Sequence, residues 1–132
     1  MGSSTAPPPA AEEQDQDLYP PDIAKMRQAV NVLLDPDAAP DALPPAPEKL
    51  DTLTLQLRGH LQRLMPEVER SARKLPKNSV TRYCVLACLG EARERLRAEP
   101  SQRYGGPAGH ARRLARALNA LLDHHEKIGG HR

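Results

Sequence analysis

The side chains best suited to chemistry in this chain are two cysteines and a histidine on neighbouring predicted helices. Cys84 and Cys88 stand one helical turn apart, and His125 lies on the apolar side of the last predicted helix. If these helices form an antiparallel hairpin, Cys84 should lie level with residues 122–125, and thiolate and imidazole groups are common zinc ligands. The rival interpretation places both cysteines in the core as small apolar residues and treats His125 as a buried histidine. Because Cys-x-x-x-Cys differs from the Cys-x-x-Cys spacing of zinc knuckles, we expect core packing and no cofactor.

Arginines gather around the predicted turn between the last two helices. Seven arginines lie within residues 93–116, where Glu94 and Glu99 are the only acidic residues. Such a patch can bind phosphates or an acidic protein surface, and the alternative is an ordinary solvated helix surface. A helix-turn-helix is not recognisable, and the three tyrosines are the only aromatic residues that could stack on bases, so nucleic acid is not expected. We expect a protein partner that contacts Arg93, Arg97, Arg103, Arg112, Arg113 and Arg116, and Arg95 belongs to the same cluster.

No catalytic signature accompanies these features. The serines lack the Gly-x-Ser-x-Gly context of a nucleophile, and no pair of carboxylates falls on one inward-facing stripe. The glycines of GGPAG precede a helix, but without the lysine and the preceding strand of a phosphate-binding loop they indicate a turn. His60 and His110 lie at the edges of apolar faces and are expected at the surface. We therefore lean against an enzymatic activity.

Charge and proline content divide the chain into two parts. Residues 1–57 carry three basic and ten acidic side chains, whereas residues 58–132 carry sixteen basic and seven acidic ones. Ten of the fourteen prolines precede residue 48, so we expect a disordered acidic tail over 1–20, a proline-rich linker over 35–46 and a flexible tail over 129–132. No apolar run is long enough to span a bilayer, and the first residues do not resemble a signal peptide. We expect a cytoplasmic protein with no membrane partner.

Apolar periodicity predicts helices and no strands. The predicted helices span about residues 21–34, 47–75, 79–98 and 107–128. The first is short and must dock on something, in cis or in trans. The second has leucines at steps of three and four that continue past Pro66 without a change of phase. We predict an all-α fold: an antiparallel three-helix bundle over residues 47–128, with the short N-terminal helix as an additional member and a homodimer as one option. The expected inward side of the third helix is formed by Cys84, Val85, Cys88, Leu89, Ala92 and Leu96.

Three stretches of the chain resemble a family of small helical actinobacterial proteins of unknown function that are labelled natural product biosynthesis proteins. They read LDTLTLQLRGHLQRLMPEVERSARKLP, CVLACLGEARERLRAEP and HARRLARALNALLDHHEKIGG, and the resemblance covers roughly residues 48–128. It implies no catalytic residue and a link to bacterial specialised metabolism.

Together these features predict a non-enzymatic interaction or regulatory protein that uses its basic bundle end. The rivals are a ligand-binding protein, metal-binding protein or enzyme that acts through Cys84, Cys88 and His125, and a nucleic-acid-binding protein.

Overall fold

The computed structural model describes residues 20–34 and 45–129. This part of the chain consists of α-helices and one short 3-10 helix without strands, which confirms the all-α prediction. The helices are α2 (Ile23–Leu34), α3 (Pro47–Arg73), α4 (Val80–Arg97), η1 (Gln102–Tyr104) and α5 (Gly106–Gly129). None of these helices is both long and apolar enough to cross a membrane. The predicted N-terminal tail, proline-rich linker and C-terminal tail lie outside the described residues, except at their edges.

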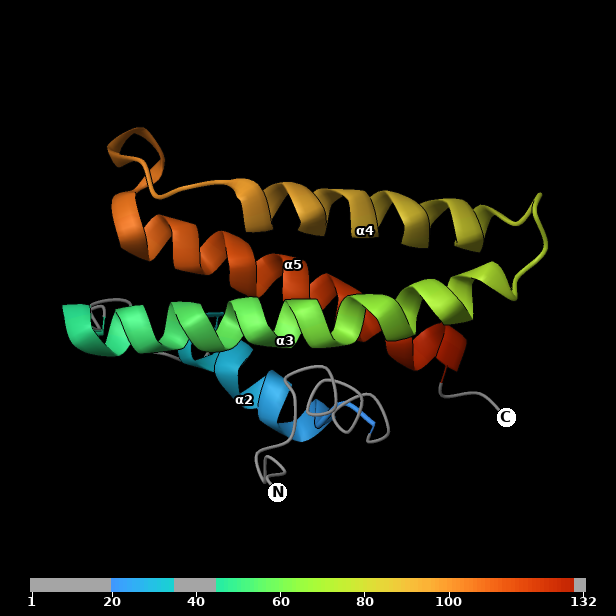
Figure 1. Cartoon of the computed structure of the whole chain (residues 1–132), viewed down its shortest axis with the longest axis horizontal. Coiled ribbons are helices and arrows are strands. Elements are labelled where there is room, and N and C mark those ends of the chain that lie inside the picture. The colour runs from blue at the N-terminus through green and yellow to red at the C-terminus, as the bar shows by residue number, and fades with distance from the viewer. Residues whose placement is uncertain (1–19, 35–44, 130–132) are drawn as a thin grey trace, which may run out of the picture.

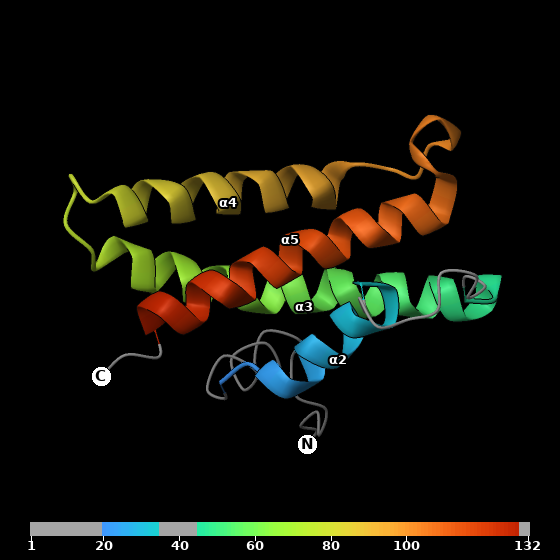
Figure 2. The ribbon, with the colours of Figure 1, turned by 180° about the vertical axis from the view of Figure 1, so that it is seen from behind.

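The central helix of the fold is α5. It packs against α2, α3 and α4, whereas α2 and α4 make no contact with each other in the described part of the chain. Figure 1 and Figure 2 show α4 along one side of α3 and α5, and α2 on the opposite side. The predicted bundle of three long helices is therefore present, and its outer side at α4 is not covered by any described helix.

Local sequence signals explain several helix ends. The side chain of Asp22 accepts a hydrogen bond from the backbone amide of Lys25 at 3.1 Å, just before α2. The hydroxyl of Ser79, at the start of α4, accepts one from the amide of Arg82 at 3.1 Å. Gly105 has φ 88, a left-handed conformation that glycine adopts without strain, and the chain turns there into α5.

One aliphatic core joins all four α-helices. The buried residues of α3 follow each other at steps of three and four, as predicted, and the helix continues through Pro66. Leu75 lies two residues beyond the end of α3 at Arg73 and is half-buried. The largest fully buried side chains are Met26, Leu57, Leu61, Leu64, Leu89, Leu114, Leu118, Leu121, Leu122, Val30, Val68 and Val85.

The short helix α2 docks in cis. Met26 and Val30 belong to the common core and are 1% and 2% exposed. Arg27 donates hydrogen bonds from the same helix to Asn119 Oδ1 at 2.8 Å and to Asp123 Oδ1 at 3.1 Å. These contacts join α2 to α5 of the same chain. The sequence left docking in cis or in trans open, and in this structure α2 docks in cis.

His110 corrects the prediction of a surface histidine, because it is only 4% exposed. It lies four residues before Leu114 and so continues the buried stripe of α5. The sequence did not indicate this, because a polar residue interrupts the apolar pattern at this position. Burial, together with the positive charges of Arg113 and Arg58, lowers the pKa of His110 below its ordinary value.

We expect the free energy of unfolding to decrease as the pH is lowered from about 7.5 to about 5.5. Burial lowers the pKa of His60 as well, with help from Lys25, so both histidines bind a proton less readily in the folded chain than in the unfolded one. Below the ordinary histidine pKa of about 6.5, protons therefore favour the unfolded chain. Urea unfolding at the two pH values measures the loss. The variant His110→Gln should depend less on pH, and an unchanged dependence would exclude His110 as a cause.

Candidate functional site

The two cysteines and His125 do not form a common site. Cys84 is exposed, which corrects the prediction that it faces the core, and Cys88 is half-buried beside α5. His125 lies in a different pocket, next to Ile23 and Ser71. Within the described part of the chain, no three His, Cys, Asp or Glu side chains form a group that could hold a metal ion. These three residues therefore belong to different surfaces of the bundle.

The exposure of Cys84 follows from the rotation of α4. The buried residues Val85, Leu89 and Ala92 define its inner side. Cys84 is rotated about 100° away from Val85, and this places its side chain outside the contact with α3 and α5. The prediction failed because α4 carries small or apolar residues on more than one side, so hydropathy alone does not identify the buried one.

The predicted arginine cluster is divided among several surfaces, and Arg93 belongs to the side of α4 that meets α3. Its Nη2 lies 3.5 Å from Oε1 of Glu69. Glu69 also accepts a hydrogen bond from Arg73 at 2.6 Å. This hydrogen bond lowers the pKa of Glu69, and the charges of Arg73 and Arg93 add to the effect. Arg93 thus takes part in an ion-pair network between α3 and α4.

Other members of the cluster are exposed at the same end of the bundle. Arg97 lies 3.4 Å from Glu94 one turn earlier in α4, and both side chains are largely in solvent. Such an exposed pair contributes at most about 1 kcal/mol to stability. Arg103 precedes α5, and Arg112 lies on its solvent side.

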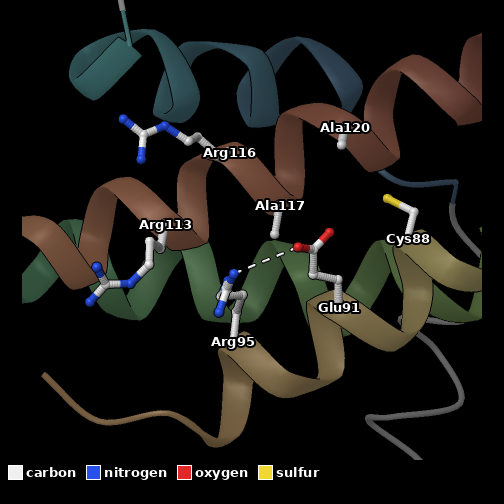
Figure 3. Close-up of a pocket in the computed structure, with 7 residues that line it drawn as sticks. All are labelled: Cys88, Glu91, Arg95, Arg113, Arg116, Ala117 and Ala120. Carbon is white, nitrogen blue, oxygen red and sulfur yellow. Dashed lines mark ion pairs between the residues drawn. The ribbon is translucent and has the colours of Figure 1, made fainter. Parts of the chain in front are cut away.

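The remaining arginines line a groove between α4 and α5 (Figure 3). The groove has a volume of about 270 Å³. Its short lining residues are Ala117 and Ala120 on α5 and Cys88 on α4, and longer charged side chains flank them. Figure 3 shows Glu91 and Arg95 extending from α4 toward Ala117 of α5. The lining consists of Cys88, Glu91, Arg95, Arg113, Arg116, Ala117 and Ala120.

The groove combines a positively charged rim with an uncharged base. Its three arginines outnumber its one acidic residue, Glu91, which lies 3.6 Å from Arg95. Burial raises the pKa of Cys88, and the negative charge of Glu91 adds to this shift. The thiol therefore stays protonated at neutral pH and is a poor nucleophile. The groove is suited to bind anionic groups with some apolar contact.

The sequence indicates only part of the groove. Arg113 and Arg116 were in the predicted partner-binding set, and Cys88 was predicted inside the core. Ala117 and Ala120 were missed, because their role depends on which side of α5 faces α4. The available signal was a pair of alanines three residues apart beside the arginines of α5.

Comparison with known proteins identifies a family without an assigned activity. The model of a family of unknown function (DUF6415) matches residues 24–130. This match begins inside α2, whereas the resemblance seen in the sequence began near residue 48, so α2 is part of the region that the family shares. No curated protein and no solved structure matches the chain significantly.

Proposed function

Because the chain belongs to this family of unknown function, we propose a function from its geometry: a non-enzymatic interaction module that binds an acidic segment of a partner protein between α4 and α5. One observation carries the proposal: Arg95, Arg113 and Arg116 line the same groove, and short, uncharged side chains form its base. A module of this kind would act by recruiting or regulating its partner. The link to bacterial specialised metabolism and the cytoplasmic location stay predictions from the sequence.

The chemistry of the rim suits carboxylates. A guanidinium presents a planar set of donors that matches a carboxylate with two parallel hydrogen bonds. Each such pair is worth only about 0–1 kcal/mol when it remains in solvent, so binding needs several pairs together with apolar contact at the base. Cys88, Ala117 and Ala120 offer that contact. We therefore expect weak binding that becomes weaker as salt is added.

The structure refines which arginines we assign to the partner. Arg93 faces Glu69 of α3, and Arg97 lies beside Glu94, so neither lines the groove. Arg103 and Arg112 are also outside its lining. We therefore assign the main contacts to Arg113 and Arg116 from the predicted set, with Arg95 added.

Replacing Arg116 with glutamate should weaken binding of an acidic peptide by roughly tenfold or more, because attraction at the rim becomes repulsion. The probe is a fluorescein-labelled helical peptide with glutamates and leucines along one side, and fluorescence anisotropy measures its affinity at several salt concentrations. Arg116 is exposed, so the fold should tolerate the change.

The variant Lys49→Glu is the matched control, since it changes the net charge equally at an exposed position that lies outside the groove. It should bind the peptide as the unmodified chain does. Equal losses in both variants would show that binding follows overall charge and not the groove. Displacement of the peptide by an unlabelled DNA duplex of matched charge would instead favour nucleic acid as the ligand.

A further inference from the structure

The outer side of α4 exposes apolar side chains that no described residue covers. Val80 is 77% exposed and Tyr83 is 75% exposed, although both belong to a helix with a well-buried inner side. Within the described part of the chain, α4 packs only against α3 and α5. Figure 1 and Figure 2 show that this outer side points away from the rest of the bundle. Large exposed apolar side chains in one row are typical of an interaction surface.

The spacing of these residues is that of a helix–helix seam. Val80, Tyr83, Ala87 and Gly90 follow each other at steps of three, four and three, which places them in one row along α4. We call this row the outer seam. It lies on the side of α4 opposite to the buried Val85, so folding of the single chain does not account for it.

The outer seam has a large half and a small half. Its N-terminal half consists of Val80 and Tyr83, and its C-terminal half consists of Ala87 and Gly90. A Cβ atom built on Gly90 would meet nothing within 4 Å, so the space above the small half is open. A row with this shape fits a second row that runs in the opposite direction, because large side chains then meet small ones.

We propose that two copies of this chain pair through antiparallel α4 helices. In that arrangement Val80 lies opposite the second copy's Gly90, and Tyr83 lies opposite its Ala87. A two-fold axis between the helices uses the same surface on both copies, as in most homodimers. A parallel pair would set Tyr83 against Tyr83 and leave Gly90 facing Gly90, which packs less well.

The charges at the ends of the seam favour the same direction. Lys77 is exposed just before α4, and near the C-terminal end of α4 the side chain of Glu94 is 68% exposed, 3.4 Å from Arg97 of the same helix. Antiparallel pairing brings Lys77 of each copy toward Glu94 of the other, whereas parallel pairing does not. Opposite charges at a rim direct orientation more than they add affinity.

The pairing is independent of the proposed function. None of the outer-seam residues lines the groove between α4 and α5. A dimer would therefore present two grooves, and loss of pairing need not abolish peptide binding. Self-association and peptide binding can therefore each be absent without the other.

Light scattering after size-exclusion chromatography of the full chain tests the pairing. We expect a mass of twice 14.5 kDa that falls toward 14.5 kDa on dilution. Ala87→Glu should weaken self-association roughly a hundredfold, because a carboxylate would be buried against the second copy's Tyr83. Leu55→Glu is the matched control: Leu55 is 71% exposed on α3, away from the seam, so this variant should pair normally.

Cross-linking through the native cysteines gives a second readout that leaves the outer-seam residues unchanged. Cys84 flanks the seam, and an antiparallel pair centred near residue 85 places the two Cys84 residues on the same side, about 3 Å apart along the helix axes. A short bis-maleimide should therefore join two chains in Cys88→Ser but not in Cys84→Ser. A chain that stays monomeric, or a dimer unaffected by Ala87→Glu, would overturn the proposal and leave the seam to a different partner.

Discussion

Replacing Leu118 with alanine is expected to lower the free energy of unfolding by about 2–5 kcal/mol. Leu118 is fully buried in α5, the helix that packs against all the other α-helices. Its truncation removes apolar contacts and leaves a cavity that the surrounding helices can close only in part. A core built from so short a chain provides only about 3–5 kcal/mol of net stability, so much of this variant should be unfolded at room temperature.

Urea unfolding followed by circular dichroism measures this loss, at one fixed protein concentration so that any self-association contributes equally. Leu55→Ala is the matched control, since it makes the same chemical change at a leucine that is 71% exposed on α3. Its effect should remain within about 0.5 kcal/mol. Similar losses in the two variants would contradict the assignment of Leu118 to the core.

Replacing Met26 with alanine should cost about 2 kcal/mol or more and detach α2 from the bundle. Met26 is 1% exposed, and the packing of α2 also depends on Val30 and on the hydrogen bonds of Arg27 to α5. A helix of this length is not stable by itself in water, so loss of docking should unfold it. The expected results are lower helicity, a lower urea midpoint and faster trypsin cleavage after Lys25 and Arg27.

The control for this experiment lies on the same helix. Val32 is 61% exposed, so Val32→Ala should change neither the urea midpoint nor the cleavage rate by much. If Met26→Ala behaved like this control, α2 would not be docked in cis in solution. The position of α2 would then need another explanation, such as docking onto a second chain.

The helices could be predicted closely because their signals are local. The leucine spacing of α3 and the hydroxyl of Ser79 at the start of α4 act within one or two turns, and the leucine stripe is buried at the spacing that the sequence predicted. Pro66 did not end α3, because the buried stripe keeps its phase on both sides of it. Periodicity and capping were therefore sufficient for the fold class.

The candidate site was less predictable because it depends on how the helices are rotated against each other. The arginines near the turn were visible in the sequence, but their division between Glu69 on α3 and the groove beside α5 was not. Cys84 was misplaced because α4 has apolar residues on two sides. His110 was misplaced for the opposite reason, since a polar residue continues an apolar stripe.

Binding of an acidic segment between α4 and α5 is tested most directly by mapping an acidic peptide on the isotope-labelled chain by NMR. We expect saturable shift changes at the backbone amides of Cys88, Ala117 and Ala120, which line the groove, with little change at Leu55 on the solvent side of α3. Added salt should reverse these changes. Absence of shifts, or shifts centred on another surface, would contradict the proposed function.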